Sequence, residues 1–107
     1  MSDKKNPNPP QELNIELSEE IAEGIYTNFA MIGHSPSEFV LDFVRLLPNL
    51  NKAKVKSRVI MSPQQAKRFM LAMRENLKIY ENQFGLIKED NTPPMPPVQF
   101  NSPKGLA

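Results

Sequence analysis

Four basic side chains alternate along one short segment of the chain: Lys52, Lys54, Lys56 and Arg58. On a β-strand, alternate residues lie about 6.6–7 Å apart on one face, close to the spacing of phosphates along a nucleic-acid backbone. Two bases further along, Lys67 and Arg68, are expected to extend this surface. The pattern predicts an anion or nucleic-acid patch. The alternative is a solvated sheet face whose bases pair across strands with acids such as Glu12, Glu16 and Glu23.

The overall charge argues against making nucleic acid the leading partner. The 107 residues carry 13 Lys and Arg against 12 Asp and Glu, for a net charge of +1. The chain has no tryptophan, and no aromatic side chain lies between the bases of residues 52–58 to stack on a nucleotide. Nucleic-acid binding is therefore an alternative function.

Three other groups of residues could do chemistry. His34 is the only histidine and lies next to Ser35, as a general base for a serine nucleophile would, but a polar hairpin turn explains the same residues. The acids Glu19, Glu20 and Glu23 could hold a hard cation, although acids near a strand more often form a solvated edge. We therefore expect no catalytic residue, cofactor or metal, and no enzymatic activity.

Asp42 differs from these candidates because it lies in an apolar segment. A buried carboxylate usually needs a partner, and Arg45 and Arg58 are the bases that we expect to supply one. This interpretation assigns Asp42 a structural role.

Composition excludes several classes of protein. Without cysteine, the chain has no disulfide, thiolate metal site or cysteine nucleophile. No apolar run approaches the roughly 20 residues of a membrane span, and residues 1–10 lack the apolar core of a signal peptide. We expect a soluble, cytoplasmic protein that does not enter a membrane.

The charges are also divided along the chain. Residues 11–42 contain seven acids and no Lys or Arg, whereas residues 45–78 contain nine bases and one acid. An acidic half that meets a basic half favours self-association, and a basic half alone favours an anionic partner.

The prolines predict where the folded part begins and ends. Eight of the 11 lie in residues 1–10 and 90–107, which we interpret as disordered tails, the second of them Pro-rich. The remaining residues, 11–89, form one predicted domain. A domain of that size buries only about 60–65% of its unfolded surface, so we expect an oligomer, with a dimer favoured.

Hydrophobic periodicity predicts four strands, at residues 12–17, 22–33, 39–47 and 53–61. Residues 39–47 also fit a helix that begins with a capping box at Ser35 and Glu38, but the preceding apolar run is a natural hairpin partner and favours the strand. A long helix is expected over residues 63–84, with Ser62 as N-cap, Pro63 in its first turn and Gly85 after its end. Its apolar stripe consists of Ala66, Phe69, Met70, Met73, Leu77, Tyr80 and Phe84.

The second and third predicted strands are apolar on both faces, whereas one helix can cover only one face of a small sheet. The other face needs a second copy or another partner. The candidate self-association surface consists of Ile25, Phe29, Met31, Val40 and Val44.

Three motifs resemble those of a small, uncharacterised bacterial and archaeal family of domains of unknown function. They are Tyr26-Thr27-Asn28 opening an apolar strand, the run from His34-Ser35-Pro36 to Asp42-Phe43 with a later Pro48, and the run from Ser57 to Ser62-Pro63-Gln64-Gln65-Ala66-Lys67 that enters a long helix ending near Tyr80-Glu81. Together they span about residues 12–85. The resemblance implies no established activity, and it supports a strand at residues 39–47.

The order of the elements is also similar to that of the protein-export chaperone SecB, in which consecutive antiparallel strands precede a long helix. We therefore predict that the chain is an α+β domain, with a small antiparallel sheet of about four strands followed by one long helix packed on it. It acts as a self-associating interaction or scaffold module. The alternatives are a nucleic-acid accessory protein that uses residues 52–58 and a SecB-like chaperone that binds apolar peptides.

Overall fold

The computed structural model describes residues 11–49, 51–89 and 98–101. The chain divides into two compact units, one up to Ala66 and the other from Lys67 onward. The predicted tails at residues 1–10 and 90–107 lie outside the described residues, except for residues 98–101.

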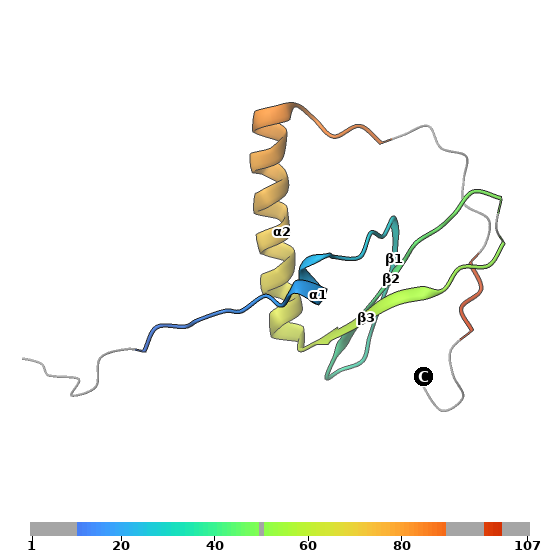
Figure 1. Ribbon diagram of the computed structural model, residues 1–107, viewed down its shortest axis with the longest axis horizontal. Helices are drawn as coiled ribbons and strands as arrows, with labels where there is room; N and C mark the ends of the chain where they lie inside the picture. The colour runs from blue at the N-terminus through green and yellow to red at the C-terminus, as the bar shows by residue number, and fades with distance from the viewer. Residues whose placement is uncertain (1–10, 50, 90–97, 102–107) are drawn as a thin grey trace, which may run out of the picture. The chain divides into compact units, whose positions relative to one another are not determined.

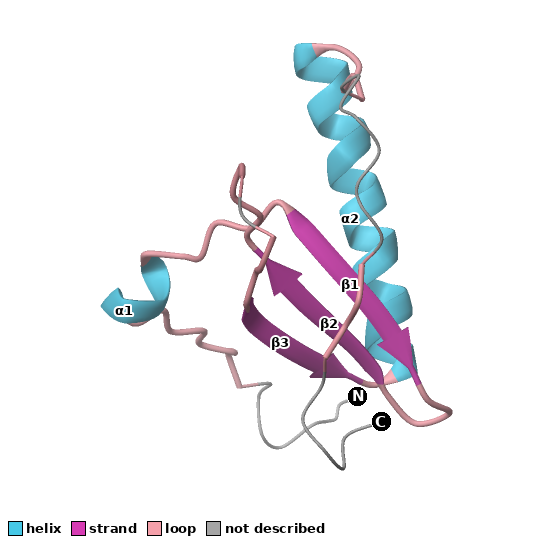
Figure 2. Cartoon of the chain, turned by 90° about the vertical axis from the view of Figure 1, so that its right-hand side faces the viewer, coloured by secondary structure: helices cyan, strands magenta, loops and turns pink. Residues whose placement is uncertain are grey.

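The first unit contains an antiparallel sheet, in which β1 (Phe29–His34), β2 (Phe39–Val44) and β3 (Val55–Met61) lie side by side in chain order (Figure 2). A short helix, α1 (Glu19–Ala22), precedes it, and the long helix α2 (Pro63–Phe84) begins two residues after β3 (Figure 1). The predicted α+β class, with a sheet followed by a C-terminal helix, is confirmed. The described residues form three strands where about four were expected.

The β1–β2 hairpin turns at the Ser-Pro-Ser segment that predicted it. Ser35 N–H donates to the carbonyl of Glu38 at 2.9 Å, and the Ser35 hydroxyl accepts from the N–H groups of Ser37 and Glu38 at 3.3 and 3.2 Å. His34 stacks on Phe39 beside the turn, where the two residues form the last pair of the hairpin, with ring centroids 5.4 Å apart. Local hydrogen bonds of this kind hold a tight turn.

The strand interpretation of β2 is confirmed, but the strand ends at Val44 rather than at residue 47. Beyond Val44, the side chain of Asn28 makes the hydrogen bonds to the backbone of the β2 segment. Its side-chain amide donates to the Leu46 carbonyl at 3.0 Å, and its side-chain oxygen accepts from Leu46 N–H at 2.7 Å. Pro48 and Asn49 then form a turn, in which Asn49 has a φ of 65°, a conformation that Asn tolerates better than most residues.

Two of the predicted strands are wrong in part or whole. Residues 12–17 form no strand, and residues 22–28, predicted as the start of the second strand, lie before β1. Ser18 instead caps α1, because its hydroxyl accepts from Ile21 N–H at 3.3 Å. Gly24, with a φ of 76°, follows the helix end in the left-handed conformation that glycine adopts readily.

The bounds predicted for α2 are confirmed at both ends. The Ser62 hydroxyl accepts from Gln65 N–H at 3.1 Å, as an N-cap does, and Pro63 is the first helical residue. Gly85 has a φ of 93°, and its N–H donates to the Glu81 carbonyl at 2.9 Å. The packing of α2 on the sheet stays a prediction. Among the described residues, no helix combines the length and apolar composition that crossing a membrane requires.

Candidate functional site

An ion pair joins the central strand to its neighbour. Asp42 and Arg58 lie opposite each other in the β2–β3 register. The Arg58 guanidinium donates through Nε to Oδ1 of Asp42 at 2.7 Å and through Nη2 to Oδ2 at 2.9 Å. Two parallel bonds between planar groups make this a strong, oriented contact. Of the two partners expected from sequence for Asp42, the structure shows Arg58. Arg45 lies near Tyr26, with its guanidinium carbon 5.9 Å from the ring centroid.

The environment of Asp42 explains its charge state. The residue is 4% exposed. The hydrogen bonds from Arg58 lower the pKa of the carboxyl below its ordinary value, the Arg58 charge lowers it further, and burial opposes both by raising it. The same contact raises the pKa of Arg58. The pair is therefore ionised at neutral pH and holds β2 against β3.

Acidification is expected to remove this contribution to stability. A carboxyl whose pKa is lower in the folded state stabilises the fold above its unfolded pKa of about 4, and the stabilisation is lost as pH falls through the lower folded pKa. Urea unfolding between pH 7 and pH 2 measures the effect. An Asp42→Asn control should lose less stability over this range than the parent chain, and equal losses would contradict the assignment.

The register defines two faces of the sheet. On one, which we call the Asp42 face, Phe29, Met31, Val40, Asp42, Val44 and Arg58 lie together. On the other, the Phe43 face, Leu41 and Phe43 lie with Ser57, Val59 and Met61. Among the described residues, the buried apolar side chains are Leu41 on the Phe43 face and Val44 on the Asp42 face, 6% and 5% exposed. The apolar core of the sheet is thus small on both sides.

Four members of the predicted self-association surface share the Asp42 face. They are Phe29, Met31, Val40 and Val44. The fifth, Ile25, is separate from them, because it lies in the segment after α1 and lines a groove on the Phe43 face. Self-association through these residues stays a prediction.

The predicted basic face of residues 52–58 is interrupted. Lys52 and Lys54 precede β3, which begins at Val55. A bulge between Phe43 and Val44 pairs Val55 with Val44 and Ser57 with Phe43. Val55 therefore shares the Asp42 face with Arg58, which simple alternation would forbid. Lys67 and Arg68 are exposed on α2 in the second unit, and the patch that they would extend stays a prediction.

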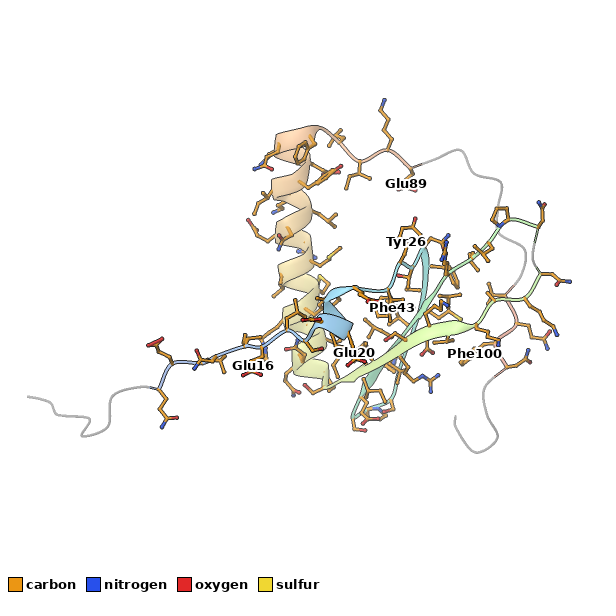
Figure 3. All side chains as sticks on the ribbon, in the orientation of Figure 1. Glu16, Glu20, Tyr26, Phe43, Glu89 and Phe100 are labelled. Carbon is orange, nitrogen blue, oxygen red and sulfur yellow. The ribbon has the colours of Figure 1, made fainter. Side chains whose placement is uncertain are left out.

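An apolar groove of about 510 Å³ lies between the α1 segment and the Phe43 face. Its lining includes Glu20 on α1 and Phe43 on β2 (Figure 3). The other lining residues are Ile21, Gly24, Ile25, Thr27, Ser57 and Val59. Sequence reasoning missed this groove because it missed α1. Ser18 followed by two acids, with Gly24 five residues after Glu19, is the signal that could have indicated a short capped helix.

The remaining candidates are dispersed. His34 and its neighbouring serines form the exposed hairpin turn, and Glu19 and Glu20 occupy the first turn of α1. In the part of the chain that the structure describes, no three His, Cys, Asp or Glu side chains are grouped closely enough to hold a metal ion.

The sequence model of one protein family, described as proteins of unknown function and named DUF3467, matches residues 1–89. The chain belongs to this family. The match covers the sheet, both helices and the three motifs that suggested an uncharacterised family, so that resemblance is confirmed. Neither a curated protein nor a solved structure matches this DUF3467 chain significantly.

Proposed function

We propose that this DUF3467 chain is a non-enzymatic protein-interaction module that self-associates, with a dimer as its smallest assembly. The observation that supports the proposal most directly is the surface of α2. None of its 22 residues, all of them described, is buried. The large apolar members of its stripe range from 40% exposed at Leu77 to 70% at Phe84.

An exposed stripe of this length is unfavourable in water. Burying one large apolar side chain contributes about 1.5–3 kcal/mol, and contiguous apolar patches usually mark contact sites. The stripe repeats at spacings of three and four residues over the whole helix, the pattern with which helices pack against each other. A second copy supplies an identical stripe, and a symmetric dimer covers both.

The charge distribution supports the same partner. The acids of residues 11–42 and the bases of residues 45–78 allow the acidic part of one copy to meet the basic part of another. Opposite charges of this kind guide the orientation and rate of association more than its strength.

Sedimentation velocity over a micromolar concentration range tests the proposal. The expected result is a dimer or larger species that dissociates on dilution. A sample that remains monomeric at the highest concentration would contradict self-association.

A second candidate function is supported by the groove on the Phe43 face. A volume of about 510 Å³ lies within the range of ligand sites, and the side chains of Ile21, Ile25, Phe43 and Val59 offer apolar contact. The groove would accept apolar side chains of an extended peptide, as a chaperone resembling SecB requires. Glu20 beside it favours a client that also carries basic residues.

Aggregation of an unfolded client protein, followed by light scattering, measures this activity. The chain at stoichiometric ratio should suppress aggregation, and Ile25→Asp should weaken suppression about tenfold or more through loss of one apolar contact. Ile87→Asp is a matched control, because Ile87 is comparably exposed but lies outside the groove. No suppression by the parent, or an equal loss in both variants, would contradict the proposal.

Nucleic-acid binding by residues 52–58 stays a prediction with weaker support. Arg58 is hydrogen-bonded to Asp42, and the bulge breaks the alternation that suggested a row of phosphate contacts. The cytoplasmic location expected from the composition also stays a prediction.

A further inference from the structure

Residues 12–17 have the composition of a strand without belonging to one. Leu13, Ile15 and Leu17 alternate with polar residues, as in a half-buried strand. In the structure, Leu13 and Ile15 are both 85% exposed, and the segment has no regular secondary structure. An exposed segment with this pattern is suited to pair with the free edge of a sheet.

The sheet offers two edges. Within the described residues, the sheet order places β1 and β3 at its two sides, each hydrogen-bonded to β2. Such edges present backbone donors and acceptors to an added strand. β1 contains no acid, lysine or arginine, whereas Lys56 lies in β3 and Lys54 lies just before it. Because residues 12–17 carry Glu12 and Glu16, charge complementarity favours β3.

The position of α1 favours a second copy over the same chain. Glu20 and Ile21 of α1 line the groove over the Phe43 face. Only Ser18 separates Leu17 from α1, and one extended residue spans about 3.5 Å, less than the roughly 10 Å between packed layers. Leu17 therefore cannot reach the plane of its own sheet while α1 keeps its place, so residues 12–17 cannot pair over their whole length with β3 of the same chain.

We propose that residues 12–17 of one copy add to the β3 edge of a second copy as its fourth strand. This inference rests on the proposed self-association and adds a second contact between the copies to the one proposed for α2. Alternation then places Leu13, Ile15 and Leu17 beside Val59 and Met61 on the Phe43 face, extending the wall of the apolar groove. Glu12 and Glu16 lie on the opposite face, the side on which Asp42 and Arg58 are paired.

Cross-linking between two single-cysteine variants tests the proposal, because the parent chain contains no cysteine. Tagged Ile15→Cys is mixed with untagged Val59→Cys and treated with a short bismaleimide, so that a heterodimeric product reports contact between chains. The matched control is Ile32→Cys, which lies on the other edge strand and on the same sheet face as Val59. We expect the Val59 variant to give a several-fold higher yield than the Ile32 variant.

Charge reversal provides a second measurement. Glu12→Lys with Glu16→Lys should lower the yield several-fold, and pairing that variant with Lys54→Glu and Lys56→Glu in the acceptor should restore it. Equal yields from Val59 and Ile32 would overturn the choice of β3. A sample that sediments as a dimer but gives no heterodimeric product would overturn strand exchange and leave self-association standing. A monomeric sample would overturn both, and product formed only within an Ile15→Cys, Val59→Cys double variant would overturn exchange between copies.

Discussion

Replacing Arg58 with methionine is expected to destabilise the sheet more than replacing Asp42 with asparagine. The methionine variant leaves the Asp42 side chain, which is 6% exposed, without its two hydrogen bonds from the guanidinium. The asparagine variant removes the charge, and the Arg58 side chain, 34% exposed, keeps access to water. We expect Asp42→Asn to lower the free energy of unfolding by about 1.5–3 kcal/mol. Urea unfolding at pH 7 measures both variants.

The pH dependence separates this explanation from general damage to the sheet. Without Arg58, the cause that lowers the pKa of Asp42 most is removed, and burial then raises that pKa above its unfolded value. A group with a raised folded pKa favours folding when protonated, so the Arg58→Met variant should recover stability as pH falls toward 4. The double variant, Asp42→Asn with Arg58→Met, should lose less free energy of unfolding than the two single variants lose together. Additive losses, or the same pH profile in the parent and Arg58→Met, would contradict the coupling.

Introducing glutamate into the apolar stripe of α2 is expected to abolish self-association at micromolar concentration. Met73 and Leu77 lie near the middle of the stripe, and each would contribute about 1.5–3 kcal/mol when buried in an interface. Because a symmetric dimer contains every substitution twice, one change costs about 3–6 kcal/mol and weakens association about 10²- to 10⁴-fold. Sedimentation velocity of Met73→Glu and Leu77→Glu measures the loss.

Asn82→Glu is the matched control, since it adds the same charge on the opposite side of the helix. It should retain the parent's association and helical circular dichroism. If Met73→Glu and Leu77→Glu associate as tightly as the parent, α2 is not the interface. If Asn82→Glu dissociates to the same extent, net charge rather than the stripe governs assembly.

The elements that were predicted accurately have local causes. The helix α2 begins where Ser62 and Pro63 cap it and ends where Gly85 adopts a positive φ, and each of these is a property of a few neighbouring residues. The β1–β2 hairpin likewise depends on the short-range hydrogen bonds of Ser35. The bounds of α2 and the position of the hairpin turn could therefore be read from composition and spacing.

The errors concern segments whose conformation depends on distant partners. Residues 12–17 have a strand pattern, but a strand requires another strand to satisfy its backbone donors and acceptors. Residues 19–21 lie between the first two predicted strands and Ala22 begins the second, because the strand prediction did not take account of the Ser18 cap. The groove was not predicted for the same reason, because α1 forms one of its walls.

By itself, the sequence determined the α+β class, the position of α2 and the need of Asp42 for a basic partner, since periodicity, caps and the cost of burying a charge act through nearby residues or residue type. Only the tertiary structure decided that Arg58 rather than Arg45 meets Asp42, because the choice depends on the register of β2 and β3. It also decided that a bulge places Val55 and Arg58 on one face, which breaks the row of alternating bases first seen at residues 52–58. Strand register is set by the whole sheet, and a shift of one residue reverses every side chain, so spacing along the chain could not determine which face each base occupies.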